Sequence, residues 1–278
     1  MIKSILLSVD GSIYTESVLK YGIHLAKAFD ARLKVITIVD IRFVEWAVAM
    51  GTDGFVPIIP STVYQEESRK ILEAKAEAVI QKSTEILQKE QVEFGTEKIV
   101  GSPVDIIFEQ SHLVDLLILG ARGEFARWQS KLVGATLEAV VRQCNKPILI
   151  VNKDFRPLKK ILVAYDGSEK ANKALQMAGF FAAKLQRPVL VLTVHDNEQI
   201  RNKYLQEAKT YLDSYEIAVT LKGTEGSPEK EILTIAQSDQ CDIIIMGAFG
   251  HSRIREAILG SITEHVMRHA TLPVLLVK

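Results

Sequence analysis

The chain repeats its own sequence, and this repeat restricts its fold more than any other feature does. Three segments of the first half return in the second half in the same order, which indicates duplication of a whole domain. The matching segments are KSILLSVDGS (3–12) with KKILVAYDGS (159–168), LLILGARG (116–123) with IIIMGAFG (243–250), and NKPILIV (145–151) with TLPVLLV (271–277). We therefore predict two domains, 1–154 and 155–278, which meet in the short polar segment NKDFRPLKK (152–160).

Length and charge narrow the class of protein. A chain of 278 residues with 47% hydrophobic side chains has enough apolar material for two buried cores. Its 34 basic side chains balance its 34 acidic ones, so no excess positive charge points to nucleic acid or an anionic membrane as a partner. The first apolar run ends at Asp10, and no uninterrupted apolar segment reaches the roughly 18 residues of a membrane span. We expect a cytoplasmic protein, with Cys144 and Cys241 as buried free thiols because neither has CxxC spacing.

Short apolar runs rich in β-branched residues alternate with helical segments in each half. Those of the second half are KILVAY (160–165), PVLVLTV (188–194), EIAVTLK (216–222), CDIIIMG (241–247) and LPVLLV (272–277). Such runs are typical of strands covered on both faces of a parallel sheet. From Ala171 to Leu185 apolar side chains recur with the helical period, and Ser168 or Gly167 stands where an N-cap belongs. We predict an α/β fold of two tandem doubly wound domains, each a five-stranded parallel sheet with helices on both faces.

The last strand of each half predicts how the domains meet. Both PILIV (147–151) and PVLLV (273–277) are apolar throughout. An apolar strand at a sheet edge is a liability unless another strand covers it. We therefore predict that these two strands pack the domains into a pseudo-twofold pair.

Several residues of the second half stand at the end of a predicted strand or at the start of the last helix. They are Asp166 for the first strand, Val194 and His195 for the second, Gly247 for the fourth, and Gly260 with Ser261 for the helix. Ligands of doubly wound sheets bind at this edge, at the switch point of strand order. Gly247 and Gly250 would let backbone N–H groups approach a ligand, and a helix N-terminus favours an anion such as a phosphate. Each feature also occurs singly as an ordinary turn or cap, and the chain has neither a P-loop nor a GxGxxG motif.

Taken together, these residues resemble the universal stress protein family, and the resemblance extends over essentially the whole chain as a tandem pair of that family's domains. The family's nucleotide signature is G-x2-G-x9-G-[ST], which the second half matches without a gap. The resemblance implies an adenine nucleotide alpha hydrolase-like fold that binds ATP, with Mg²⁺ accompanying the phosphates and no metal site formed by a protein motif. It implies that Asp166 and the backbone at Val194 hold adenosine, that Gly247, Gly250, His251 and Ser252 line the ribose and phosphate loop, and that Gly260, Ser261 and Ile262 receive the phosphates.

The first half departs from this signature at its phosphate end. Gly120 and Gly123 keep the first spacing of the signature, but ten residues instead of nine separate Gly123 from Gly134. Ala135 stands where the family has Ser or Thr. Asp10 and Ile38 remain at the positions that match Asp166 and Val194. We therefore expect a weaker second site there, which could hold adenine without holding the phosphates firmly.

The first half is also longer between its second and third strands. From Thr37 to Gly101 there are 64 positions, against 33 from Thr193 to Gly226, so 31 residues are added. Most of them lie in the apolar stretch 41–65, and an amphipathic helix is predicted to follow over 66–88. A lid, an oligomer contact and a cover for its own domain all stay open as roles for this insertion.

No spacing in the chain demands a catalytic group. Asp166, His195, His251, Glu256 and His265 are candidates near a triphosphate, but none stands in a motif for a general base or a metal ligand. His265 and His269 lie one helical turn apart, yet no third zinc ligand is evident. The resemblance implies a cytoplasmic ATP-binding regulatory protein of the stress response, whose nucleotide changes its contacts with a protein partner or with a second copy. An ATP-independent interaction protein and a slow ATPase stay open as alternatives.

Overall fold

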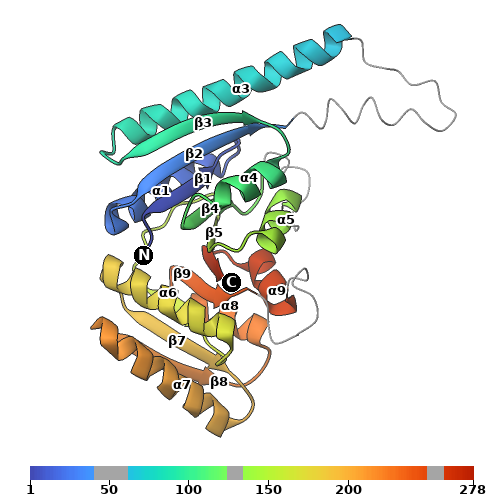
Figure 1. Ribbon diagram of the computed structural model, residues 1–278. Coiled ribbons are helices and arrows are strands. Elements are labelled where there is room, and N and C mark those ends of the chain that lie inside the picture. The colour runs from blue at the N-terminus through green and yellow to red at the C-terminus, as the bar shows by residue number, and fades with distance from the viewer. Residues whose placement is uncertain (41–61, 124–133, 249–259) are drawn as a thin grey trace, which may run out of the picture.

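A computed structural model describes residues 1–40, 62–123, 134–248 and 260–278, with residues 62–65 described by their backbone alone. These residues form one ten-stranded sheet with helices on both faces (Figure 1). The strands of the first half are β1 (Ser4–Ser8), β2 (Arg32–Val39), β3 (Phe94–Val100), β4 (Leu116–Gly120) and β5 (Ile148–Val151). Those of the second half are β6 (Ile161–Ala164), β7 (Val189–Val194), β8 (Val219–Thr224), β9 (Ile243–Gly247) and β10 (Val274–Val277).

Each half also has four α-helices among the described residues, and they follow the strands in the same order. The first half has α1 (Thr15–Phe29), α3 (Thr62–Gln88), α4 (Pro103–Ser111) and α5 (Ala135–Gln143). The second half has α6 (Glu169–Leu185), α7 (Glu198–Leu212), the 3-10 turn η2 (Asp213–Tyr215), α8 (Pro228–Ser238) and α9 (Ser261–His269).

The strand order confirms the predicted duplication of a doubly wound fold. The order is β3-β2-β1-β4-β5-β10-β9-β6-β7-β8, so each half has the same order read outward from the centre. Strands within a half run parallel, whereas β5 and β10 pair antiparallel at the centre. The predicted pairing of the last strands is therefore confirmed, and Figure 1 shows the two halves on either side of this join. The connection from Val151 to Ile161 is short, while the domain limits at residues 154 and 155 stay a prediction.

Two layers of apolar side chains hold the helices to the sheet. One layer joins α1, α3, α6 and α7 to one face of the sheet, and it includes the fully buried Phe181. The other layer joins α4, α5, α8 and α9 to the opposite face, and it includes Val140 and Val266. The central strands β4, β5 and β9 are buried on both faces, which explains their continuous apolar sequence.

The connection between the halves is anchored on α1. The backbone N–H of Arg156 donates a hydrogen bond to the Tyr21 hydroxyl at 3.1 Å. The Phe155 ring packs edge-on against Tyr21, with the ring centroids 4.7 Å apart, and it also contacts His24. The connecting segment therefore packs against the first half.

The structure also tests the expected N-cap and the expected state of the cysteines. The Ser168 hydroxyl accepts a hydrogen bond from the Ala171 N–H at 3.1 Å, which confirms Ser168 as the N-cap of α6. Cys144 and Cys241 are buried free thiols, as expected, and burial raises the pKa of Cys241 to about 11.

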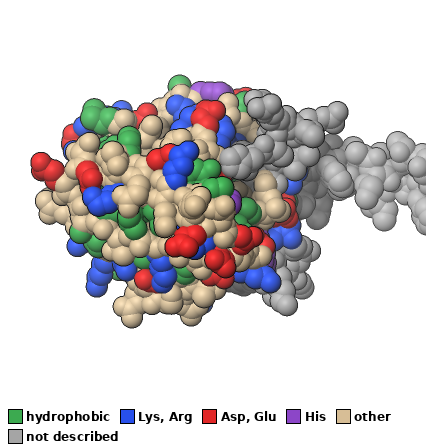
Figure 2. Space-filling view, turned by 90° about the horizontal axis from the view of Figure 1, so that it is seen from below, with side chains coloured by type: hydrophobic (Ala, Val, Ile, Leu, Met, Phe, Trp, Pro, Cys, Tyr) green, Lys and Arg blue, Asp and Glu red, His purple; other side chains and the backbone are tan. Residues whose placement is uncertain are grey.

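Among the described helices, none combines the length and the apolar sequence needed to cross a lipid bilayer. On the face in Figure 2 acidic and basic side chains are intermixed, in keeping with their balanced numbers.

The structure corrects three of the predicted elements. The helix expected over residues 66–88 begins earlier, at Thr62, so the end of the predicted insertion is helical. The strand expected over residues 216–222 is shifted to Val219–Thr224, because Glu216 has a positive φ of 53° where the preceding turn ends. The outer strands β3 and β8 are also partly exposed rather than covered on both faces, since each lies at an edge of the sheet. The stretch 41–61 lies outside the described residues.

Candidate functional site

The candidate site lies at the carboxyl edge of the second half, where the strand order switches. From β6 the chain passes to β7 on one side, while β9 lies on the other side. In doubly wound sheets such a switch point is the place where the ligand crevice is found. Asp166, Val194, Gly247 and Gly260 are all placed at this edge, since they follow or end these parallel strands or precede α9.

The turn after β6 fixes the Asp166 carboxylate. One of its oxygens accepts a hydrogen bond from the Ser168 N–H at 3.0 Å. Gly167 has a φ of +74°, and a Cβ at this residue would collide with the ring of Tyr204 on α7. A side chain at residue 167 would therefore be strained by its backbone and by its neighbour, which explains the glycine between Asp166 and the cap of α6.

The end of β7 presents the Val194 backbone to the switch point. The Leu192 carbonyl accepts a hydrogen bond from the Tyr165 N–H, so the backbone groups of Leu192 face the β6 side. The His195 N–H donates to the Thr224 carbonyl at 3.0 Å, so the His195 backbone faces β8. Neighbouring residues of a strand direct their backbone groups to opposite edges, and the Val194 groups therefore face the β6 side.

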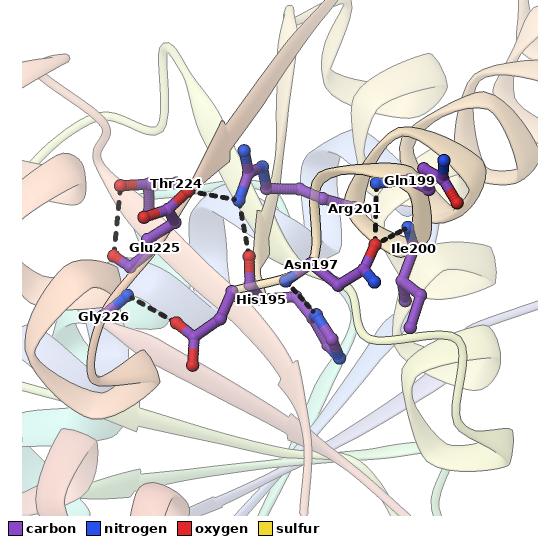
Figure 3. A network of polar contacts seen from close by, with 9 residues as sticks. His195, Asn197, Gln199, Ile200, Arg201, Thr224, Glu225 and Gly226 are labelled. Carbon is purple, nitrogen blue, oxygen red and sulfur yellow. Dashed lines mark hydrogen bonds and ion pairs between the residues drawn. The ribbon is translucent and has the colours of Figure 1, made fainter.

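A network of polar contacts surrounds the residue after Val194 (Figure 3). The Arg201 guanidinium donates to the His195 carbonyl at 2.6 Å and lies 3.4 Å from the Glu225 carboxylate. The His195 Nδ1 accepts a hydrogen bond from the Asn197 N–H at 2.9 Å. The side-chain Oδ1 of Asn197 in turn caps α7 by accepting hydrogen bonds from the backbone N–H groups of Gln199 and Ile200. The turn from β7 into α7 is thus held by side chains at several points.

The start of α9 is the remaining part of the candidate site. Gly260 is the N-cap, with φ −62° and ψ 142°, and no side chain caps the helix at this residue. The first intrahelical bond runs from the Glu264 N–H to the Gly260 carbonyl at 2.9 Å. The N–H groups of Ser261 and Ile262 precede this bond and have no acceptor within the helix, which is the feature that attracts anions to helix N-termini.

Gly247 has a packing role in the structure. A Cβ at this residue would lie 2.8 Å from the Lys170 Cβ and 2.9 Å from the Lys170 carbonyl carbon, in the first turn of α6. The next residue, Ala248, donates its N–H to the Val277 carbonyl at 2.7 Å. Lys278 follows directly, and burial together with the positive charge of Lys170 lowers its pKa to about 8. Two lysines therefore lie near the end of β9.

The first half has the same framework with a different loop. Its Asp10 carboxylate accepts from the Ser12 N–H at 2.9 Å, as Asp166 accepts from Ser168. A Cβ on Gly123 would lie 3.1 Å from the other Asp10 oxygen, so the loop after β4 lies against this carboxylate. The Gly134 N–H donates to the Ala121 carbonyl at 3.3 Å, which brings the two ends of that loop together.

The remaining positions of the first half follow the fold. Ile38 lies in β2 at the position of Val194 in β7, and it is partly buried. Gly120 ends β4, and a Cβ there would lie 2.7 Å from the Tyr14 Cβ. Tyr14 thus takes the place that Lys170 has in the second half. Gly134 is the N-cap of α5, as Gly260 is of α9.

Some predicted residues lie outside the described ranges, and His265 lies farther along α9 than the candidate site. Gly250, His251, Ser252 and Glu256 are outside the described residues. His265 lies in α9, where its ring stacks on His269 with centroids 4.2 Å apart, and its carbonyl lies 2.8 Å from the His269 Nδ1.

The amino edge of the second half has a cavity of its own. Its volume is about 500 Å³, and its lining includes Arg156, Cys241, Asp242 and Leu272, which precede strands rather than follow them. Of the residues predicted to hold the nucleotide, none that the structure describes is part of its lining.

Sequence reasoning missed Arg201 and Tyr204. Both belong to α7 and contact the turns that follow β7 and β6. A basic and an aromatic residue on a helix carry no motif, and only their spacing from Asn197 could have drawn attention to them. Their role depends on how α7 packs beside β7 and β8.

Comparison with known proteins gives consistent matches. The model of the universal stress protein family matches residues 1–152, 157–203 and 196–278. Universal stress protein Slr1230 of Synechocystis sp. is 30% identical over 285 residues, which cover 98% of this chain and 99% of that protein. Universal stress protein MJ0577 of Methanocaldococcus jannaschii is 31% identical over 153 residues, which cover 43% of this chain and 94% of that protein. A solved universal stress protein from Archaeoglobus fulgidus covers 99% of this chain and 98% of its own, with a TM-score of 0.77 at 22% identity, and so shares its fold.

Proposed function

Because the chain belongs to the universal stress protein family as a tandem two-domain member, we propose that it is an ATP-binding regulatory protein of the stress response. ATP binds mainly in the second half, and its presence changes the contacts of the protein with a partner or with a second copy. The observation that carries this proposal is the start of α9, where Gly260 caps the helix without a side chain and the signature spacing ends.

The phosphates are assigned to this helix start. Gly260, Ser261 and Ile262 receive them through backbone N–H groups and the positive end of the helix dipole. Lys170 and Lys278 add positive charge near the end of β9. Mg²⁺ would accompany the phosphates, because this ion is usually held through substrate phosphates rather than by a cage of protein ligands alone.

Adenosine is assigned to the opposite side of the crevice. The Asp166 carboxylate suits the ribose hydroxyl groups, because it is a charged acceptor held in a fixed turn. The Val194 backbone suits the edge of the adenine base, because its polar groups face the switch point. Gly247, Gly250, His251 and Ser252 complete the proposed set along the ribose and phosphate loop.

The first half is proposed as a weaker site. Its loop lies against Asp10, and Tyr14 stands where the second half has Lys170. A nucleotide at Asp10, Ile38, Gly120, Gly123 and Gly134 would therefore meet less open space and less positive charge. We expect one molecule of ATP per chain at moderate concentration.

A mass measurement tests this proposal. The full chain is purified gently without added nucleotide and then denatured in acid, and the released small molecules are identified by mass. ATP near one equivalent per chain supports the proposal. The control is the same chain unfolded and refolded before the measurement, which should release none. Absence of adenine nucleotide from the native chain, together with no heat of binding when ATP is titrated in, would refute it.

A further inference from the structure

We propose that Arg201 is a positioning residue for the adenine base. Its guanidinium holds the His195 carbonyl and so fixes the backbone that presents Val194 to the nucleotide. This inference rests on the proposed function, because it assigns Arg201 to the adenine side of that same site. It adds a residue that lies outside the signature motif and on a different element, α7.

The contacts of Arg201 are those of a held side chain. The guanidinium donates to the His195 carbonyl at 2.6 Å and lies 3.4 Å from the Glu225 carboxylate (Figure 3). The Arg201 side chain is only 13% exposed, so its contact with the His195 carbonyl is largely shielded from water, whereas the Glu225 carboxylate is 68% exposed. Hydrogen bonds from a charged donor are stronger than neutral ones, and their loss inside a protein leaves a carbonyl without its partner.

The His195 backbone is thereby fixed on both sides. Its N–H donates to the Thr224 carbonyl, and its carbonyl accepts from Arg201. In a planar trans peptide the N–H and the C=O point in opposite directions. With the His195 N–H directed to β8, the carbonyl of Val194 is directed to the β6 side, where the base is proposed to lie. By holding the His195 carbonyl, Arg201 fixes the peptide unit that follows His195. It thereby prevents the peptide unit between Val194 and His195 from rotating.

The first half holds the matching carbonyl by different means. Val39 occupies the position of His195, and its carbonyl accepts a hydrogen bond from the backbone N–H of Gly101 at 3.1 Å. In the second half the matching N–H, that of Gly226, lies 3.5 Å from the Asp196 side chain instead. The backbone bond of the first half is therefore replaced by a side-chain bond from Arg201 in the second.

The neighbours of Arg201 differ between the halves in the same sense. The strand registers align Gly223 with Lys98, which pairs with Glu77 on α3. A Cβ on Gly223 would lie 2.8 Å from the Arg201 Cγ and Cδ, so the glycine provides the space that the arginine fills. Val79 on α3 packs against Gly11, and Tyr204 on α7 packs against the equivalent Gly167. Three residues before each of these side chains, Arg201 therefore aligns with Ala76, which is buried. Only the second half, within the described residues, has this arrangement.

The experiment measures base selectivity together with affinity. Arg201→Met removes the guanidinium and keeps the aliphatic stem, and Arg201→Lys keeps a single charged donor. Lys203→Met is the matched control, since it removes a positive charge from the same helix at a side chain that is 69% exposed. Dissociation constants for ATP, GTP and inorganic tripolyphosphate are measured with each full-length chain, and thermal unfolding verifies that each chain is folded.

The expected result is a loss confined to the base. Arg201→Met should weaken ATP binding by about tenfold, the size expected for one charge-assisted hydrogen bond, and should reduce the preference for ATP over GTP. Tripolyphosphate binding should stay as in the natural chain, Arg201→Lys should recover part of the preference, and Lys203→Met should change nothing.

Two other results would overturn the inference. One is an unchanged ratio of GTP to ATP dissociation constants in Arg201→Met. The other is an equal loss for ATP and tripolyphosphate, which would indicate a general structural effect. If Arg201→Met does not fold, the same ratios in Arg201→Lys decide the question. If the natural chain binds no ATP, the proposed function itself fails, and this inference fails with it.

Discussion

Leu149 of β5 lies directly opposite Leu275 of β10 in the antiparallel register that joins the two halves, and both side chains are fully buried. In the sequence repeat these two leucines occupy the same position. When equivalent residues face each other in this way, a two-fold axis passes between them. The tandem chain therefore contains within one molecule the self-complementary contact that a symmetric dimer forms between two.

Truncation of this pair should lower the stability of the whole chain. Leu149→Ala or Leu275→Ala leaves a cavity at the join and should cost about 2–5 kcal/mol of unfolding free energy, measured by chemical denaturation. The double variant should lose less than the sum of the two single losses, because the side chains are neighbours.

Leu113→Ala is the control for this prediction, because Leu113 is 68% exposed. Its effect should stay within about 0.5 kcal/mol. A loss in Leu149→Ala no larger than that of Leu113→Ala would mean that the two halves do not depend on this join.

His24 should make the protein less stable in mild acid. Its Nε2 is buried and has no hydrogen-bond partner among the described residues, and burial together with the charge of Arg187 lowers its pKa below the usual 6.5. The unfolded chain then binds a proton at a higher pH than the folded chain. Stability is complete above about pH 6.5 and falls as the pH decreases below it, by up to about 1.4 kcal/mol per pH unit for this one group.

Denaturation of His24→Gln at pH 7 and pH 5 checks this dependence. The variant should lose less stability than the natural chain between these two pH values. His112→Gln, which changes an exposed histidine, should behave as the natural chain does. The explanation fails if His24→Gln and the natural chain show the same difference.

Hydrolysis of ATP, if it occurs, should be very slow. Phosphoryl transfer is accelerated mainly by positioned cations and an oriented water. The proposed site offers backbone N–H groups at Ser261 and Ile262. Such groups would bind the ground state and the transition state about equally and so would not raise the rate of the chemical step. A steady-state assay should give a kcat below about 1 s⁻¹, the low end of ordinary enzymes. A faster rate that Asp166→Ala or Ser261→Ala abolishes would make the protein an ATPase.

The sequence predicted the fold well because its main signals are local or repeated. β-branched apolar runs mark the central strands, and their order in two copies predicts the doubling of the sheet. Ser168 and Gly260 could be placed at helix starts, since a small or hydroxyl residue before an apolar helical stripe has few other uses. The pairing of β5 with β10 followed from their apolar edges.

The features that the sequence did not predict depend on packing between distant elements. Arg201 reads as a solvated helix residue until α7 is placed beside β7 and β8. Gly247 reads as a residue that lets a ligand approach, and the structure adds that it also lets α6 approach β9. The run 216–222 was expected to be covered on both faces, but β8 is only partly buried because it lies at an edge of the sheet.

The central claim, that the second half holds ATP at the start of α9, is tested most directly by titration calorimetry with two matched variants. Gly260 and Gly134 have nearly the same backbone angles, with φ −62° at each, so valine at either residue is compatible with the local backbone. Gly260→Val places a branched side chain at the proposed phosphate site and should weaken binding of ATP with Mg²⁺ at least tenfold, or about 1.4 kcal/mol. Gly134→Val should leave the affinity within about twofold of the natural chain, a free-energy change of roughly 0.4 kcal/mol. Equal losses in the two variants, or a loss in Gly134→Val alone, would contradict the claim.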